Sequence, residues 1–358
     1  MDIEDKMKLI REVGEEIITE EDLKKLFSSD EKLIAYDGFE PSGQMHIAQG
    51  ILRTININKM TKTGIKFKMW VADWHAFANN KMGGDMDKIQ LVGRYFIEVW
   101  KACGMDLDNV EFVWASELLK DPDYWKLVLQ IAKTNSINRF VRTAEIMGRE
   151  ESMDLTAAQI IYPCMQCADI FMLGAKITQL GMDQRKVNML AREVGPQLGY
   201  WKPVVVSHHM LMGLGTPATE TEDKTKRTIE LKMSKSKPDT SIFMTDTSED
   251  IKRKVSKAWC PEGEIKENPI LEYCKYILFE KYDTLTIERP EKWGGNIVVK
   301  SYAELEEKFA SKEIHPLDLK ATVTAKLDEL LEPVRKHFEE NEEAKKLLAE
   351  VKALQITR

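Results

Sequence analysis

The stretch from Tyr36 to Gly50, which reads YDGFEPSGQMHIAQG, has residue types that could bind phosphate. An apolar run leads into turn residues, and a His follows at the head of a helical pattern. A strand, a glycine-bearing turn and a helix in this order aim backbone N–H groups at an anion. We expect Ser42 to cap the helix, His46 to donate from its first turn, and Gly50 to let a nucleotide lie flat on it. Taken alone, the stretch fits a plain strand–helix connection with a surface His somewhat better than it fits a phosphate-binding site.

A second stretch, Lys232–Ser236 (KMSKS), carries two lysines three residues apart in a segment without strong periodicity. Two point charges on a flexible loop suit a triphosphate whose charge must be neutralised while a group is transferred. A lone stretch of this kind is compatible with a solvated loop. Together with the strand, turn and His-bearing helix, it indicates nucleotide chemistry.

The most informative helical pattern is Leu155–Leu173 (LTAAQIIYPCMQCADIFML). Tyr162, Gln166 and Asp169 are spaced four and three residues apart, which places them on one face of a helix. Their neighbours are apolar, so this polar face should be buried, and buried polar groups need partners. Internal pairing is the commoner outcome. The alternative is a ligand, because a buried carboxylate beside a phenol-sized space can accept a hydrogen bond from a substrate hydroxyl.

The five cysteines are scattered, and an odd number without framework spacing favours a reducing compartment. Cys164 and Cys167 form a C-x-x-C inside the same helical pattern. One pair supplies only two of the four ligands that zinc takes, and no second pair or nearby His completes the set. We therefore interpret the pair as helix packing and predict no structural metal.

The net charge of −7 argues weakly against binding to bulk nucleic acid. A local exception runs from Lys224 to Lys237, where six basic residues stand against one acid, so a phosphate-bearing partner is possible there. Residues Met1–Ile17 are acidic and have no apolar core, which predicts an amphipathic helix rather than a secretory signal. No apolar run approaches the roughly 18–20 residues that cross a bilayer.

Five short apolar runs rich in β-branched residues predict strands: Lys32–Phe39, Ile65–Asp73, Val110–Ser116, Ala175–Gly181 and Pro203–Leu211. Helical patterns separate them, and such alternation indicates a parallel α/β sheet. After about Ser241 helical patterns dominate, with caps expected at Ser248, Asn268, Ser301 and, near a first turn, Pro316. We therefore predict an N-terminal helical segment at 1–30, an α/β domain at 31–240 and a helical domain at 241–358.

At the two opening stretches the sequence resembles the class I aminoacyl-tRNA synthetases, and within them the tyrosyl-tRNA synthetases of the archaeal and eukaryotic kind. His46–Gln49 (HIAQ) stands where the class carries its HIGH signature. Ala48 replaces the Gly of that signature and Gln49 replaces its second His. Lys232–Ser236 matches the second signature in full. The resemblance covers essentially the whole chain.

This resemblance implies a Rossmann-like catalytic domain with a parallel sheet, a helical insertion at about 110–153 and a KMSKS loop at 224–240. An all-α anticodon-binding domain is expected to follow. The family is usually a homodimer whose interface lies on the insertion, which implies a homodimer here.

The resemblance implies tyrosine as the amino-acid substrate. The matched residues are Tyr36 and Asp169 for the phenol, Tyr162, Gln166 and Gln184 for the α-amino group, and His75, within Ala72–Phe77 (ADWHAF), beside the ring. For His75 a core histidine is an equally good interpretation. The phenol pair argues against a relative specific for tryptophan, because an indole offers only an N–H donor.

ATP is the second substrate that the resemblance implies. Asp183, within Gly181–Lys186 (GMDQRK), matches the residue that reaches the ribose beyond the carboxyl end of a strand. The other implied ATP contacts are Gly38, Ser42, Gly43, His46, Gln49, Gly50, Met233 and Ser234. Because the tyrosine carboxylate is already ionised, its attack on the α-phosphate needs no general base. His46, Lys232 and Lys235 are then expected to stabilise the triphosphate, with Mg²⁺ held mostly by phosphate oxygens and water.

Two later segments, Arg289–Asn296 (RPEKWGGN) and Glu313–Lys320 (EIHPLDLK), resemble the anticodon-reading segments of these enzymes. Trp293 and His315 offer stacking faces, worth roughly 1–3 kcal/mol per base, and Asp318 an acceptor for a guanine edge. Without the resemblance, a packed Trp293 and a capping Asp318 would be preferred. The implied partner is tRNA(Tyr), and the implied compartment is the cytoplasm.

Two alternatives belong to other functional classes. A small-molecule nucleotidyltransferase of the same fold would not need Trp293 or Asp318. A retired synthetase kept as an RNA-binding or signalling protein would not need the two KMSKS lysines or a complete tyrosine pocket.

Overall fold

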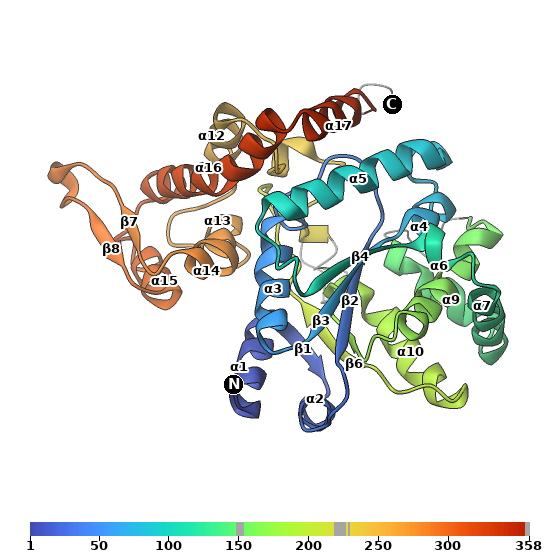
Figure 1. The fold of residues 1–358 in the computed structure, drawn as a ribbon. Coiled ribbons are helices and arrows are strands. Elements are labelled where there is room, and N and C mark those ends of the chain that lie inside the picture. The colour runs from blue at the N-terminus through green and yellow to red at the C-terminus, as the bar shows by residue number, and fades with distance from the viewer. Residues whose placement is uncertain (148–153, 218–226, 228–229, 355–358) are drawn as a thin grey trace.

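A six-stranded sheet organises the first part of the chain in the order β1-β6-β5-β2-β3-β4 (Figure 1). The computed structural model describes residues 1–147, 154–217, 227 and 230–354. The strands are β1 (Gly14–Ile18), β2 (Ile34–Phe39), β3 (Lys66–Val71), β4 (Val110–Trp114), β5 (Ile177–Thr178) and β6 (Val204–His208). β1 pairs antiparallel with β6, and the other pairings are parallel. The five predicted strands are confirmed.

Within this sheet, β1 was not predicted from the sequence. The N-terminal helix α1 (Ile3–Val13) begins at the capping carboxylate of Asp2 and ends at Gly14, instead of continuing to Ile17. The residues that follow pair with the fully buried β6 and so cover an edge that would otherwise expose unpaired backbone groups. α2 (Glu20–Phe27) then leads to β2, so the predicted helical segment at 1–30 contains one strand.

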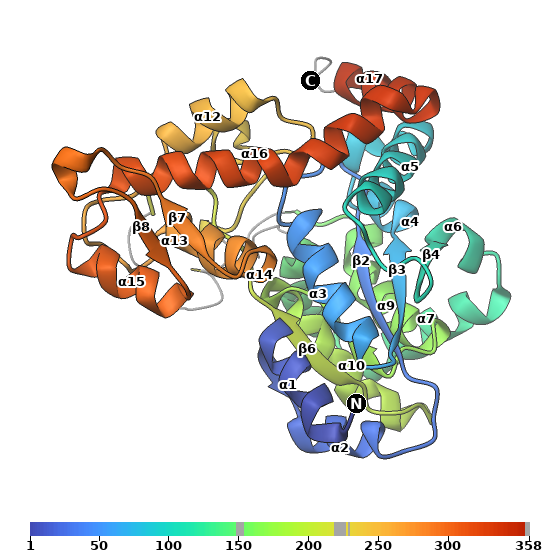
Figure 2. The same cartoon turned by 60° about the vertical axis from the view of Figure 1, so that its left-hand side comes forward.

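Helices cover both faces of the sheet (Figures 1 and 2). α1, α3 (Ile51–Lys62) and α5 (Met86–Ala102) pack on one side, and α9 (Ala157–Met172) and α10 (Arg185–Gln197) on the other. Each side has its own apolar core. Burial on both faces explains why the parallel strands read as continuous apolar runs.

β2 lies where the order of the parallel strands reverses. From β2 the sheet continues through β3 and β4 on one side, and through β5 and β6 on the other. In open α/β sheets the crevice for ligands lies beyond the carboxyl ends of the strands at such a point. The residues that follow β2 and β5 are therefore positioned to meet.

A set of helices connects β4 to β5. They are α6 (Ala115–Leu118), α7 (Pro122–Thr134), α8 (Ile137–Thr143), the 3-10 turn η2 (Ala144–Met147) and α9. The insertion predicted at about 110–153 begins too early, because residues 110–114 form β4 and belong to the sheet. Its last residues, 148–153, lie outside the described residues. Between β3 and β4 the chain forms α4 (Asp73–Ala78), η1 (Lys81–Gly84) and α5.

The second part of the chain is mainly helical, as predicted. Its helices and turns are α12 (Ser248–Ser256), α13 (Pro269–Tyr273), η5 (Cys274–Leu278), α14 (Phe279–Lys281), η6 (Glu291–Trp293), α15 (Tyr302–Ala310), α16 (Pro316–Glu340) and α17 (Glu342–Leu354). Asn268 and Ser301 cap α13 and α15 as expected, and Pro316 opens α16. Thr247, rather than Ser248, caps α12, because its hydroxyl accepts from the Asp250 N–H.

An antiparallel hairpin corrects the prediction that this part is all-α. β7 (Leu285–Ile287) and β8 (Ile297–Val299) pair in register and bury Leu285, Ile287, Ile297 and Val299 on one face. Each strand is only three residues long, so its period-2 pattern is too short to stand out in the sequence.

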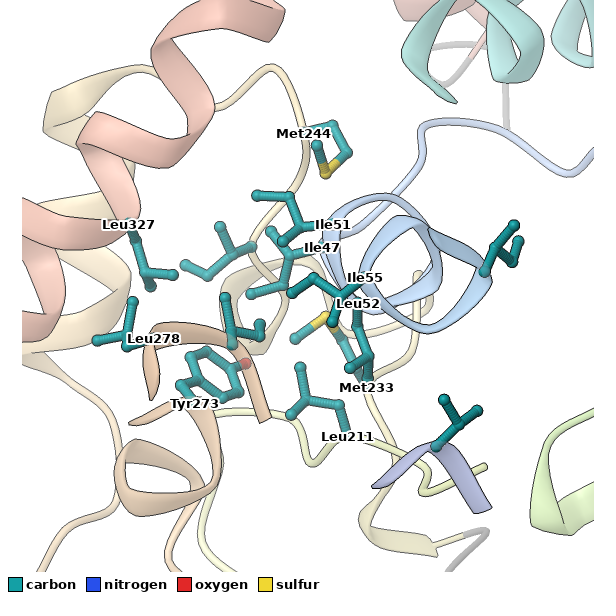
Figure 3. Packing of buried hydrophobic residues seen from close by; sticks show 14 of the residues in the cluster. Ile47, Ile51, Leu52, Ile55, Leu211, Met233, Met244, Tyr273, Leu278 and Leu327 are labelled. Carbon is teal, nitrogen blue, oxygen red and sulfur yellow. The ribbon is translucent and has the colours of Figure 1, made fainter. Parts of the chain in front are cut away.

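The helical part shares an apolar core with the α/β part (Figure 3). Ile51 and Ile55 of α3 contribute to it, together with Met233, Tyr273 of α13 and Leu327 of α16. All five side chains are buried, and burial of such a side chain contributes roughly 1.5–3 kcal/mol. Ordinary apolar packing therefore holds the two parts together. Across the described residues, no helix combines the length and apolarity needed to cross a membrane.

Candidate active site

A cavity of about 580 Å³ lies at the carboxyl ends of β2 and β5, where the strand order predicts a crevice. Of the residues predicted for a site in the α/β part, only Gly43, Gly50 and Lys235 are absent from its wall. A larger depression of about 950 Å³ lies between α5 and α17, and none of the predicted residues lines it. The predicted site residues therefore line the smaller cavity.

Asp169, the last polar residue on the buried face of α9, is held by two side chains. Its Oδ1 accepts a 2.8 Å hydrogen bond from the Tyr124 hydroxyl on α7, and its Oδ2 lies 2.9 Å from Nε2 of His75. The buried hydroxyl of Tyr36 also belongs to the cavity wall and makes no hydrogen bond of ordinary geometry with the described residues. The cavity thus brings together a carboxylate acceptor and a phenol, as the sequence predicted.

Burial and the charge on Asp169 control ionisation at this end of the cavity. Together they raise the pKa of Tyr36 and of Tyr124 well above the usual range, so both phenols stay protonated. Burial lowers the pKa of His75, but Asp169 outweighs it and the net pKa is raised. His75 is both buried and on the cavity wall, so it satisfies the core interpretation and the site interpretation at once.

Tyr162, Gln166 and Gln184 also meet on the wall of the cavity. The Tyr162 hydroxyl donates to Oε1 of Glu40 at 2.8 Å. Nε2 of Gln166 donates to Oε1 of Gln184 at 3.1 Å, and Nε2 of Gln184 donates to the carbonyl of Ile146. Internal pairing therefore exists, but Oε1 of Gln166 is buried and makes no hydrogen bond of ordinary geometry within the part of the chain that the structure describes.

Sequence reasoning missed Glu40 and Tyr124. Their contacts with Tyr162 and Asp169 join residues 122 and 45 positions apart. No local pattern specifies such pairs. The one available signal was the position of Glu40 directly after the strand β2, at the ligand-binding edge of the sheet.

A buried ion pair on the cavity wall was also missed. Oδ2 of Asp37 lies 2.8 Å from the guanidinium of Arg53, and Arg53 also donates to the side chain of Gln179. Burial raises the pKa of Asp37 to about 6. The pair could not be predicted from the sequence. Asp37 stands in an otherwise apolar strand, and Arg53 stands in a helix whose sequence does not separate a polar face from an apolar one.

His46 lies before helix α3, which corrects its predicted place in the first turn. The helix begins at Ile51 with Gly50 as its N-cap, and among the described residues no side chain caps it, Ser42 included. His46 instead pairs with Phe243, and its carbonyl closes a turn with the Gly50 N–H at 3.0 Å. Burial and the two KMSKS lysines lower the pKa of His46 well below its usual range. Its ring is therefore neutral and would act as an N–H donor rather than as a cation.

Gly50 packs against the protein, so the prediction that it accommodates a nucleotide is wrong. A Cβ atom there would come within 2.4 Å of Sδ of Met244, whose side chain is fully buried. Gly43 adopts a φ of 99°, the left-handed region that glycine tolerates. Gln49 lies on the cavity wall, and its buried Oε1 has no hydrogen-bond partner among the described residues.

The KMSKS loop lies against the stretch that follows β2. Nζ of Lys232 forms a 2.7 Å ion pair with Oδ2 of Asp183. Nζ of Lys235 donates to Oγ of Ser42 at 3.3 Å and lies 4.6 Å from the ring centroid of Phe96. Burial and the nearby Lys81 lower the pKa of Lys235 to about 7. Residues 224–226 and 228–229 of the predicted loop lie outside the described residues.

Met233 anchors this loop in the core. Its N–H donates to the carbonyl of Leu211 at 2.8 Å, and its side chain is buried among the residues of Figure 3. The carbonyl of Ser234 accepts from the hydroxyl of Ser241. Met233 and Ser234 both line the cavity, so their contact with ATP stays a prediction.

The two candidate anticodon segments lie side by side. The guanidinium of Arg289 donates to the carbonyls of Gly295 and Glu313, which ties one segment to the other. Trp293 is 66% exposed, so it does not pack inside its own domain. His315 is exposed and caps α16 through the Leu317 N–H, and Asp318 follows in the first helical turn. Their roles in reading RNA stay predictions.

Cys164 and Cys167 both lie in α9 and are buried, which confirms helix packing. Sγ of Cys167 lies 3.9 Å from the carbonyl of Val187 on α10. Within the described parts of the chain, no group of three His, Cys, Asp or Glu side chains is arranged to hold a metal ion.

A family model and two curated relatives show what this chain is similar to. The family model described as tRNA synthetases class I (W and Y) matches residues 28–332. Tyrosine–tRNA ligase 1, cytoplasmic, of Arabidopsis thaliana is 50% identical over 360 residues, which cover 100% of this chain and 90% of that protein. The tyrosine–tRNA ligase of Thermococcus sibiricus is 43% identical, with 100% of both chains covered.

Solved structures give the same result. Tyrosyl-tRNA synthetase from Pyrococcus horikoshii, complexed with L-tyrosine, has a TM-score of 0.91 at 39% identity, covering 98% of this chain and 100% of that one. The Leishmania major tyrosyl-tRNA synthetase, in complex with tyrosinol, has a TM-score of 0.89 at 44% identity. That alignment covers 99% of this chain, which spans 52% of the Leishmania chain.

Proposed function

The chain belongs to the class I tRNA synthetases of the tryptophan and tyrosine group, and on that premise we propose that it is a tyrosine–tRNA ligase. It activates tyrosine with ATP and transfers the tyrosyl group to the 3′-terminal ribose of tRNA(Tyr). The observation that carries the proposal is the pairing of Asp169 with the buried hydroxyl of Tyr36 on one cavity wall. Together they offer a carboxylate acceptor and a hydroxyl donor to a substrate phenol.

This pairing selects tyrosine over its closest competitors. A buried site built for a hydroxyl rejects an analogue that lacks it, because its own polar groups are left unpaired, a rule for which tyrosyl-tRNA synthetases are themselves the standard example. Phenylalanine has no hydroxyl to offer. Tryptophan offers a single N–H donor, which could satisfy Asp169 but not the Tyr36 hydroxyl.

Activation at this site consists of positioning and charge stabilisation. A carboxylate oxygen of tyrosine attacks the α-phosphorus of ATP, the bond from that phosphorus to the bridging oxygen breaks, and pyrophosphate leaves with the electron pair. His46 donates from a neutral ring, and Lys232 and Lys235 provide positive charge to the leaving phosphates. Mg²⁺ that accompanies ATP supplies further positive charge, held mostly by phosphate oxygens and water.

Asp183 has two successive partners in this scheme. It is the residue proposed to bind the ATP ribose, and it forms an ion pair with Lys232. When the ribose hydroxyls occupy Asp183, the ammonium of Lys232 is released to the phosphates. The remaining proposed ATP contacts are Gly38, Ser42, Gly43, Gln49, Met233 and Ser234.

Transfer completes the reaction. A ribose hydroxyl oxygen of the tRNA 3′ end attacks the carbonyl carbon of tyrosyl-adenylate and loses its proton to the leaving phosphate or to water. The bond from that carbon to the phosphate oxygen breaks, the new ester forms, and AMP leaves with the electron pair. Trp293, His315 and Asp318 are proposed to read the anticodon. The 66% exposure of Trp293 supports a stacking role.

We also propose that the protein is a cytoplasmic homodimer. Six large apolar side chains are exposed on helices that pack around α9: Trp74 and Phe77 of α4, Trp125 and Leu129 of α7, Ile137 of α8 and Ile161 of α9 itself. Exposed apolar side chains that gather on one region suit an interface between two copies. The mass measured in solution by light scattering tests this.

Exchange of pyrophosphate into ATP tests the activation step. The purified protein should catalyse exchange with tyrosine and not with phenylalanine or tryptophan, and it should then charge tRNA(Tyr). Exchange with tryptophan would overturn the roles of Tyr36 and Asp169. Folded protein that gives no exchange with any of the three amino acids would overturn the proposed activity itself.

A further inference from the structure

Lys254 of α12 is a buried cation that no step of the proposed reaction uses. The residue is only 4% exposed. Its Nζ donates to the carboxylate of Asp246 at 2.6 Å and to the carbonyl of Ser241 at 2.9 Å, and lies 4.7 Å from the ring centroid of Phe243. A buried ammonium is tolerated only where such partners offset its loss of water. All three partners belong to residues 241–246, so Lys254 holds this one stretch.

The 241–246 stretch folds back on itself around the same carboxylate. The Phe243 N–H donates to Oδ2 of Asp246 at 2.9 Å, and the Asp246 N–H donates to the carbonyl of Phe243 at 3.1 Å. Burial raises the pKa of Asp246, and Lys254 opposes that rise. Lys254 therefore favours the charged form of the carboxylate that closes this turn.

The 241–246 stretch pairs with the signature residue His46. Phe243 forms an antiparallel bridge with His46. Two backbone hydrogen bonds of 2.9 Å flank this bridge, from the Ile47 N–H to the carbonyl of Ile242 and from the Met244 N–H to the carbonyl of Met45. His46 lies before α3, so the position of its backbone depends on this bridge.

The same stretch contacts the KMSKS loop from its other end. The hydroxyl of the buried Ser241 donates to the carbonyl of Ser234, inside the loop, at 2.8 Å. The carbonyl of Ser241 is the group that accepts from Lys254. One ammonium therefore holds the stretch that contacts both signature segments.

The alternative is that Lys254 serves the fold alone. A buried ion pair is weak evidence for stability, because a neutral pair of similar volume often stabilises a protein equally well. The place of this pair, against the stretch that contacts both His46 and Ser234, favours a role in positioning.

We propose that Lys254 is a positioning residue for the activation of tyrosine. Through the 241–246 stretch it holds the backbones of His46 and Ser234 where the two signature segments meet ATP. Lys254 does not line the cavity, so it acts through these residues rather than on the substrate. The inference rests on the proposed function and adds to it a residue outside the site.

A double variant, Lys254→Met with Asp246→Asn, tests the inference in pyrophosphate exchange. Both buried charges disappear together, so neither is left unpaired, and Asn keeps an acceptor for the Phe243 N–H. We expect kcat to fall by about 10- to 100-fold, because a displacement of about 1 Å at the reacting groups has effects of this size. KM for tyrosine should not change, since Lys254 holds the signature segments and not the tyrosine pocket.

The matched control is Lys59→Met with Glu280→Gln. Lys59 of α3 is also largely buried, and its ion pair with Glu280 joins the two parts of the chain away from both signature segments. This control should keep kcat. In a His46→Ala background, the Lys254 and Asp246 double variant should lose less of the remaining kcat, because one of the groups that Lys254 positions is already absent.

Exchange by the wild-type protein separates the outcomes. If the wild type is active and the folded double variant keeps kcat as the control does, Lys254 serves the fold alone and the inference is wrong, while the proposed function stands. A double variant that no longer folds, or whose loss lies entirely in KM for tyrosine, would overturn the inference as well. If the wild-type protein gives no exchange with tyrosine, the proposed function fails and takes the inference with it.

Discussion

Asp169 is the residue on which the proposed selection of tyrosine depends most. Asp169→Asn keeps the shape of the side chain and removes its charge. We expect kcat/KM for tyrosine in pyrophosphate exchange to fall by roughly 10- to 150-fold, as loss of a hydrogen bond to a charged group does. The pKa of His75 should fall as well, because Asp169 is what raises it, and NMR titration of the imidazole would detect this.

Tyr124→Phe is the matched control for that change. It removes one donor to the same carboxylate and leaves the charge in place. Its loss in kcat/KM should be clearly smaller than the loss in Asp169→Asn. Equal losses would mean that Asp169 acts through Tyr124 and packing rather than on the substrate phenol.

Individual site residues were predictable where a local period fixes them. Helical spacing alone placed Tyr162, Gln166 and Asp169 on one buried face, where internal pairing was the commoner outcome, and the family resemblance gave them their site roles. The structure brings them to one cavity wall. Glu40, Tyr124 and the buried Asp37–Arg53 pair did not follow, because each depends on a partner that only the fold brings near. The spacing of residues in the sequence shows which side chains share one face of a helix or strand. Tertiary packing decides which side chains of other elements that face contacts.

Gly50 gives a prediction about stability rather than about nucleotide binding. Gly50→Ala places a Cβ against the buried Met244, and overpacking of this kind costs about 1–3 kcal/mol of unfolding free energy. KM for ATP should not change. Urea denaturation checks the first expectation and exchange kinetics the second.

A compensating substitution tests the cause of that loss. Met244→Ala alone should destabilise by about 2–5 kcal/mol, since it leaves a cavity. The double variant should be less destabilised than the sum of the two single variants, because the added methyl then occupies vacated space. Additive losses would show that Gly50 is required for some reason other than Met244.

At the scale of elements, long apolar runs were predictable and short or edge strands were not. The five runs in the α/β part gave the five parallel strands, since burial on both faces leaves a strong signal. β1 looked like the end of a helix, because its residues Glu15 and Glu16 extend an acidic amphipathic pattern, and pairing with β6 overrides that propensity. The hairpin β7–β8 was too short to show a period.

Hydrogen bonds through Met212 connect α13 of the helical part to the KMSKS loop. The carboxylate of Glu272 accepts from the Met212 N–H at 3.0 Å, and the hydroxyl of Tyr273 donates to its carbonyl at 3.2 Å. Met212 in turn forms an antiparallel β-bridge with Lys232. Next to this bridge, the Gly213 N–H donates to the carbonyl of Leu231 at 2.9 Å. The position of Lys232 therefore depends on α13.

Glu272→Ala should slow tyrosine activation through this connection. We expect exchange kcat to fall several-fold with little change in affinity for tyrosine, because the lost contact, worth about 1–3 kcal/mol, holds the loop and not the amino-acid pocket. In a Lys232→Ala background the same substitution should have little further effect on kcat. Glu280→Ala is the control, since Glu280 also joins the two parts, through Lys59, but away from the loop. A fall in kcat with Glu280→Ala as large as with Glu272→Ala would contradict the connection.

At the scale of the whole molecule, His209 joins three parts of the chain. Its Nδ1 lies 2.9 Å from Glu15 of β1 and its Nε2 lies 3.1 Å from Glu272 of α13, while its ring stacks on Tyr276 at 4.2 Å. Burial lowers the pKa of His209, but hydrogen bonds to the two carboxylates outweigh it and raise the pKa to about 9. Nζ of Lys275 lies 5.0 Å from the ring centroid of Tyr276, and its charge helps to lower the pKa of Glu15.

The raised pKa of His209 makes stability depend on pH in a defined direction. The folded protein holds this proton more tightly than the unfolded chain, whose His titrates near 6.5. The stabilisation, on the order of 1–3 kcal/mol, is therefore complete below about pH 6.5 and is lost as pH rises through about 9. Lys235 changes stability in the opposite direction over the same pH range, because its pKa is lowered to about 7 in the folded protein.

The measured quantity must therefore be a difference between two proteins. It is the unfolding free energy of the wild type minus that of His209→Gln, from urea denaturation between pH 6 and 10. That difference should shrink steadily above neutrality, and a difference independent of pH would mean that His209 holds the three parts together by packing alone.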